Sequence, residues 1–190
     1  MPLEHAILGF LDYQPMTGYD LKKYFDQSIA HFWSVTQSHI YKALDALEAK
    51  GLAKSTMVMQ EGAPNRKEYT ITAQGQAELR HWLATPLPLK AVREDWLIQI
   101  FFSHFSTNDE IAALLESRAE SIRSHLVTFR QNAQAAINEN ARRIGMERPR
   151  ELWQITLDYG VSFYEHELAW LEDTIARVRT LPPLMPPSNQ

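Results

Sequence analysis

The sequence contains no cysteine, and none of its apolar runs is long enough to cross a lipid bilayer. The first absence excludes disulfide bonds, thiolate nucleophiles and cysteine-based zinc sites, so the fold must be stabilised by packing. The second excludes a transmembrane helix, which needs about 20 consecutive apolar residues. Near the N-terminus, Glu4 and His5 stand where a signal peptide would have lysines and a clean apolar core. We therefore expect a cytoplasmic protein without a membrane partner.

Lysine is absent from the second half of the chain. Residues 1–90 contain nine Lys or Arg and nine Asp or Glu, whereas residues 91–190 contain ten and fourteen, and all ten of those cations are arginine. A net charge of −4 for the whole chain argues against a nucleic-acid partner, because binders of phosphate usually carry a basic surplus. The acidic surplus belongs entirely to the second half. The first half is neutral, so the net charge does not argue against DNA binding by the first half.

Two proline clusters divide the chain. Pro86 and Pro88 forbid a continuous helix and predict a linker, and the prolines at 182, 183, 186 and 187 end the last helix. We expect a first domain over residues 1–85, a linker over 86–94, a helical domain over 95–181, and a proline-rich flexible tail over 182–190.

The first half predicts a winged helix-turn-helix. Apolar residues at helical spacing predict helices over residues 3–11 and 18–29, the second capped by Thr17, and a third helix that begins at Ser34 or Thr36 and ends at Gly51. Residues 53–60 and 66–71 read as a hairpin, and Thr72 caps a fourth helix. Three helices, a hairpin and a closing helix are the order of that DNA-binding fold.

The outward positions of the third helix and the hairpin carry groups suited to DNA. The helix start offers hydrogen-bonding side chains and exposed N–H groups that favour a phosphate, and the hairpin turn offers two adjacent cations. The alternative is a solvated polar face with a solubilising turn. The candidate DNA-binding residues are Gln37, Ser38, His39, Tyr41, Lys42, Asn65, Arg66 and Lys67.

Three motifs in order give a family resemblance. Residues 18–21 (GYDL), 38–52 (SHIYKALDALEAKGL) and 64–75 (PNRKEYTITAQG) resemble the DNA-binding domain of PadR-type transcriptional regulators. The resemblance implies that residues 38–42 belong to the recognition helix, that Tyr41 lies near the DNA backbone, and that Arg66 and Lys67 belong to the wing. The family's usual glycine or serine run before the tyrosine is here Gln37-Ser38-His39, which leaves the operator sequence open.

The second half predicts long helices that pack against each other. Residues 96–102 are so apolar that we expect a helix buried on most sides, and a capping box at Thr107 and Glu110 opens a helix reaching about Arg143. Apolar residues step by three and four along this helix and along a second one after Gly145, with surface to spare for a homodimer. The residues expected at the dimer interface are Leu115, Ile122, Leu126, Phe129, Tyr159, Phe163 and Trp170; the alternative is an intramolecular core.

This long-helix extension resembles the virulence-activator-like C-terminal domain of the AphA-like branch of PadR regulators, which dimerises through these helices. That resemblance also implies a small aromatic effector, because PadR relatives sense phenolics. Aromatic walls can sandwich flat ligands, although core packing is the commoner role of tryptophan. The candidate pocket residues are Trp33, Trp96, Trp153 and Trp170.

Enzymatic chemistry finds little support. There is no glycine-rich dinucleotide loop, the adjacent Ser38 and His39 point about 100° apart on a helix, and no two histidines have the i, i+4 spacing of a helical metal site. We expect no catalytic residues, no cofactor and no metal.

The sequence thus predicts a mainly α protein with a small β-hairpin, acting as a homodimeric DNA-binding regulator on a palindromic operator. The alternative is a winged-helix protein–protein adaptor that does not bind DNA.

Overall fold

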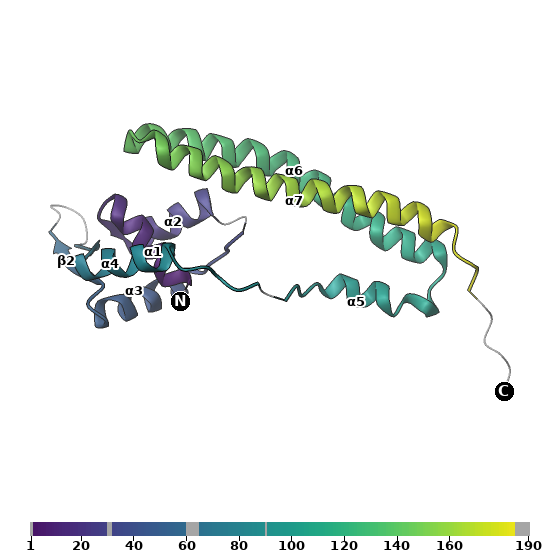
Figure 1. Cartoon of the computed structure of the whole chain (residues 1–190), viewed down its shortest axis with the longest axis horizontal. Helices are drawn as coiled ribbons and strands as arrows, with labels where there is room; N and C mark the ends of the chain where they lie inside the picture. The colour runs from purple at the N-terminus through teal and green to yellow at the C-terminus, as the bar shows by residue number, and fades with distance from the viewer. Residues whose placement is uncertain (1, 30–31, 60–64, 90, 185–190) are drawn as a thin grey trace. The chain divides into compact units, whose positions relative to one another are not determined.

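The computed structural model describes residues 2–29, 32–59, 65–89 and 91–184 (Figure 1). They form two compact units: the first consists of the chain up to Pro88 together with Glu139–Met146, and the second of Leu89–Asn138 and the chain from Glu147 onward. The mainly helical architecture predicted from the sequence is confirmed. Part of the predicted tail, residues 185–190, lies outside the described residues.

The first unit has the predicted order of helices and strands, with one strand added. Its elements are α1 (Pro2–Tyr13), β1 (Met16–Thr17), α2 (Gly18–Ser28), α3 (Gln37–Ala49), β2 (Ala53–Val58), β3 (Arg66–Ile71) and α4 (Ala73–Leu83).

Side chains at the helix ends fix these boundaries, as the sequence predicts. Thr17 and Asp20 form a reciprocal capping box at the start of α2, and Thr72 accepts a hydrogen bond from the Gly75 N–H at the start of α4. Thr36, not Ser34, caps α3. Gly51 ends α3 with a φ of 68°, and the Leu52 N–H bonds back to the Leu47 carbonyl at 2.9 Å.

The sheet has three strands in the order β1-β3-β2, all antiparallel. The predicted hairpin accounts for β2 and β3, but the sequence did not predict the third strand, β1. Met16 and Thr17 pair with Tyr69 and Glu68, so this segment is extended for two residues, the second of which is the cap of α2. Such a short strand carries no sequence periodicity, and only pairing with β3 defines it.

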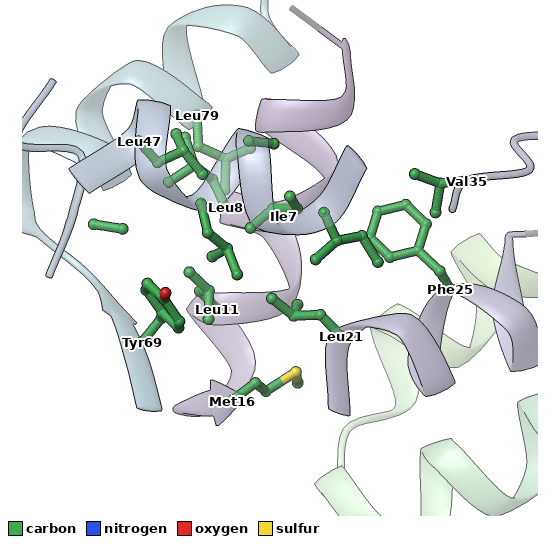
Figure 2. Packing of buried hydrophobic residues seen from close by; sticks show 14 residues of the cluster. Ile7, Leu8, Leu11, Met16, Leu21, Phe25, Val35, Leu47, Tyr69 and Leu79 are labelled. Atoms are coloured by element: carbon green, nitrogen blue, oxygen red, sulfur yellow. The ribbon is translucent and has the colours of Figure 1, made fainter. Parts of the chain in front are cut away.

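The core of the first unit lies between its helices and one face of the sheet (Figure 2). Leu8, Leu21, Phe25, Ile40 and Leu44 are completely buried in this cluster, so one face of α3 is committed to the core.

An ion pair with one buried partner also joins two helices of the first unit. Lys50 donates to the buried Glu4 carboxylate at 2.6 Å, which ties the end of α3 to α1. Burial alone would raise the pKa of Glu4, but the hydrogen bond from Lys50 and the positive charges near the carboxylate together hold that pKa below its ordinary value.

The second unit is dominated by two long antiparallel helices, α6 (Asn108–Ile144) and α7 (Glu147–Arg179), which lie side by side in Figure 1. The predicted capping box opens α6: the Thr107 N–H donates to Glu110 at 2.7 Å, and the Glu110 N–H donates to Thr107 at 3.2 Å. Gly145, with a φ of 65°, separates the two helices. The shorter α5 (Asp95–Phe101) and a 3₁₀ turn (Ser103–Phe105) precede them.

The expectation that residues 96–102 are buried on most sides was wrong for the single chain. No residue of α5 is buried; Ile98 is 59% exposed and Phe101 79% exposed. Trp96 and Ile100 do pack against the cluster formed by α6 and α7. The high apolar content of residues 96–102 indicates a surface that favours burial. It does not indicate whether this chain or a second chain buries that surface.

Arginines cross between the two long helices to acidic partners. Arg118 pairs with Glu167, Arg130 with Glu165, Arg123 with Glu172 at 2.8 Å, and Arg179 with Glu116. These pairs account for part of the arginine and acid content of the second half. None of the helices in the described ranges combines the length and apolar character needed to span a membrane.

Candidate nucleic-acid interface

The outward face of α3 starts at its N-terminal cap. The Thr36 hydroxyl accepts from the His39 N–H and lies 3.1 Å from the Ser38 hydroxyl. Because the opposite face of the helix is buried, Ser38, His39 and Lys42 are exposed, as predicted. The first two turns thus present a hydroxyl, an imidazole and an ammonium group to solvent.

Gln37 and Tyr41 also contact α2, which the sequence did not predict. The Gln37 side-chain amide donates to the Gly18 carbonyl at 3.3 Å. A Cβ atom on Gly18 would lie 2.5 Å from a ring carbon of Tyr41, so only glycine lets this ring pack against the first turn of α2. The Tyr41 side chain is still 43% exposed. In the sequence, the only sign that the Tyr41 ring packs closely against α2 is the glycine at position 18, directly after the Thr17 cap.

The wing is the hairpin of β2 and β3. Its described part includes Asn65, Arg66 and Lys67, all exposed, with Arg66 opposite Val58 and Lys67 opposite Met57 in the pairing. The predicted wing residues therefore lie together at the far end of the hairpin from α4. Sequence reasoning missed the exposure of two methionines, Met57 on β2 and Met59 just after this strand.

Both wing cations are held by carboxylates of the same unit. Arg66 lies 2.6 Å from Glu68, and Lys67 lies 2.9 Å from Glu48 in the last turn of α3. Hydrogen bonds from Ser55 and then Lys67 hold the pKa of Glu48 below its ordinary value. The same bond to Glu48, followed by the contact with Tyr69, raises the pKa of Lys67.

The residues expected at a dimer interface fall into two groups. Four of them face α7 inside the chain's own core, and three lie on the exposed side of α7: Tyr159 is 70% exposed, Phe163 49% and Trp170 41%. The second group continues through Leu152 and Ile155 as one apolar stripe, which we call the α7 stripe. The buried group is Leu115, Ile122, Leu126 and Phe129.

The four candidate effector tryptophans occupy different surroundings. Trp33 packs against the core of the first unit, and Trp153 packs beside Phe129 and Leu157 in the second. Trp96 and Trp170 meet edge to face, with ring centroids 5.7 Å apart.

Of these four, Trp96 lines a cavity within the second unit. The cavity has a volume of about 240 Å³, and Gln99, Ser117, Arg118 and Ser121 supply its polar groups. The Arg118 guanidinium lies 4.3 Å from the centre of the Trp96 ring, so an aromatic wall and a cation meet at this place. In the described part of the chain, no three His, Asp or Glu side chains come together as metal ligands would.

Two family models match the chain one after the other. The transcriptional regulator PadR-like family model matches residues 7–81, and the virulence activator alpha C-terminal model matches residues 92–179. The chain belongs to the PadR-like family of transcriptional regulators. Both predicted resemblances are confirmed. Members of this family regulate transcription and are not enzymes, so the prediction that the chain is not an enzyme is confirmed as well.

Curated relatives agree with this assignment. The chain is 25% identical over 177 residues to the negative transcriptional regulator PadR of Bacillus subtilis, a match that covers 93% of this chain and 97% of the relative. It is 44% identical over 87 residues to a probable transcriptional regulator of Mycobacterium tuberculosis. That second match spans 46% of each chain, so the chain matches about half of the length of that regulator.

Solved structures share the fold over nearly the whole length. Bacillus subtilis PadR in complex with operator DNA matches with a TM-score of 0.80 at 23% identity, covering 94% of this chain and 99% of that one. The same protein in complex with p-coumaric acid gives 0.74 at 24% identity, covering 93% and 98%. The Vibrio cholerae virulence activator AphA gives 0.72 at 23%, covering 95% and 99%. These likenesses confirm the winged-helix architecture.

Proposed function

We propose that this PadR-family regulator acts as a homodimer on a palindromic operator. The observation that carries the proposal is the shared placement, on one unit, of the exposed start of α3 and the two wing cations. The complex of Bacillus subtilis PadR with operator DNA supports it, because that protein shares this fold. The proposal includes a cytoplasmic location, because a regulator of this kind must have access to DNA.

Each candidate residue has a role that follows from its position. Ser38, His39 and Lys42, with the remaining donors and acceptors of Gln37, would reach base edges in the major groove, where hydrogen bonding distinguishes the base pairs. The phenol of Tyr41, fixed against the start of α2, would contact the DNA backbone. On the wing, Asn65, Arg66 and Lys67 would contact phosphates of the same duplex.

Replacing Arg66 with alanine should weaken binding to every duplex and lower the slope of log affinity against log salt by about one unit. The reason is that a phosphate contact releases counterions whatever the sequence of the DNA. A gel-shift titration over salt, with an operator selected from a random duplex pool, measures this slope. Arg177→Ala, which removes an exposed cation from α7, is the matched control and should leave the slope unchanged.

Substitutions at Gln37 or His39 should instead change which sequences are selected. The competing function, a protein–protein adaptor on the same scaffold, predicts no salt-dependent affinity for any duplex of the pool. That result would overturn the DNA-binding proposal.

Dimerisation through the α7 stripe is part of the proposal. A seam of large apolar residues on a 33-residue helix is the kind of surface that packs against a second helix. A two-fold dimer would place two recognition helices about 34 Å apart, one turn of DNA, and so would match a palindrome.

An aromatic effector is the third part of the proposal, and the cavity beside Trp96 is the site we favour. An aromatic acid would pack its ring beside Trp96, and its carboxylate would replace Glu94 or Glu167 as a partner of Arg118. Bacillus subtilis PadR, which binds p-coumaric acid, supports this ligand class.

Trp96→Phe should weaken binding of p-coumaric acid roughly three- to tenfold, because the smaller ring loses stacking area. Isothermal titration calorimetry on the whole chain measures the change. Trp33→Phe removes a tryptophan from the first unit and is the control, with unchanged affinity expected. Equal losses in both variants, or no binding by the parent chain, would contradict this site.

A further inference from the structure

Glu48 connects the recognition helix to both strands of the wing. It stands in the last turn of α3, where its carboxylate accepts hydrogen bonds from Ser55 on β2 and from Lys67 on β3. The Lys67 ammonium also lies 4.9 Å from the centre of the Tyr69 ring. One acidic side chain therefore holds a cation that the proposed function assigns to DNA.

This pairing sets up a competition between Glu48 and a DNA phosphate. The Glu48 carboxylate and a DNA phosphate each have an anionic oxygen that can accept a hydrogen bond from the Lys67 ammonium. Because both side chains of the Glu48–Lys67 pair are partly exposed to solvent, exchanging this pair for an ion pair with phosphate is nearly balanced. A small difference in how the wing is placed then decides which partner Lys67 keeps.

We propose that Glu48 is a specificity-determining residue, which withholds Lys67 from DNA unless base contacts made by α3 place the wing against a phosphate. The inference rests on the proposed DNA binding. On a non-operator duplex Lys67 stays with Glu48, and the wing contributes one phosphate contact fewer. On the operator Lys67 moves to the phosphate, so operator binding gains a contact that non-specific binding lacks.

The test is Glu48→Gln, whose single amide oxygen can still accept the hydrogen bond from Ser55, while the charge and the second oxygen that accepts from Lys67 are removed. The affinity for a random-sequence duplex should rise by roughly two- to fivefold per wing, the range that exposed ion pairs contribute. The salt slope on that duplex should steepen by about one unit per wing. Operator affinity should rise less, so the ratio of operator to random affinity falls.

Two further variants separate the mechanism from general electrostatics. Asp45→Asn removes a charge from an exposed position of α3, nearly one turn before Glu48, and should affect both duplexes alike with no change of slope. In a Lys67→Gln background, Glu48→Gln should no longer change the affinity for random DNA. Circular dichroism spectra matching the parent chain establish that each variant is folded.

The outcomes distinguish this inference from the proposed function. If the parent chain binds its selected operator but Glu48→Gln leaves the random-duplex slope unchanged, or acts equally in the Lys67→Gln background, the role of Glu48 is refuted and DNA binding stands. If the parent chain binds no duplex at all, the proposed function itself fails.

Discussion

Replacing Gly75 with alanine will destabilise the first unit by about 3 kcal/mol or more. The new Cβ would lie 2.0 Å from the carbonyl oxygen of Leu52 and 2.8 Å from Cγ1 of Ile71. The Leu52 carbonyl cannot move aside without breaking its bond from the Thr72 N–H, which joins the end of α3 to the start of α4. A thermal unfolding curve followed by circular dichroism should show a midpoint lowered by about 10 °C or more.

Gly9→Ala is the matched control for that experiment. Gly9 stands inside α1, and apart from its chain neighbours and the backbone of that helix, no atom of the described residues lies within 4 Å of the position of its new Cβ. Since alanine is the better helix former, this variant should be equally stable or up to about 1 kcal/mol more stable. A Gly75→Ala protein as stable as Gly9→Ala would show that the α3–α4 junction is not tightly packed.

A chain carrying both Tyr159→Glu and Phe163→Glu should be monomeric and should bind its operator about 100-fold more weakly. The two side chains are exposed on α7 in the single chain, so their replacement leaves its own core intact. Placed in a dimer interface, the two carboxylates would be buried without partners. Loss of the dimer removes the gain from binding two half-sites together, which is on the order of 10²–10⁴ in affinity.

Sedimentation velocity gives the oligomeric state, and gel shift with the selected operator gives the affinity. Ser124→Glu introduces one such carboxylate at an exposed position of α6 and should leave both unchanged. If the doubly substituted chain remains a dimer, the α7 stripe is not the interface. If it becomes monomeric but binds its operator as well as the parent, dimerisation does not contribute to DNA binding.

Local signals in the sequence predicted most of the helix boundaries. Thr17, Thr72, Thr107 and Gly51 each act within a few residues of their own position, so their type and spacing suffice to place an end. The periodicity of the apolar residues in α3 predicts its buried face. The DNA-binding candidates of this helix lie on the opposite, exposed face.

Contacts between residues far apart in sequence were not predictable in the same way. The Glu48–Lys67 pair and the packing of Tyr41 on Gly18 join elements about twenty residues apart, and neither has a periodic signal. Likewise, apolar spacing indicated that Phe129 and Phe163 belong to packing surfaces. It did not show that the first is covered by the chain's own α7 while the second is left exposed.

The distribution of lysine along the chain makes its two halves chemically distinguishable. Every lysine lies within residues 1–90, whereas the pairs that join α6 to α7 use arginine alone. A reagent that acylates amines would remove the charges of Lys42 and Lys67 and leave these interhelical pairs intact. Acylation, whether by a reagent or by an enzyme, would thus act on the proposed DNA-binding surface without touching the charges that hold the long helices together.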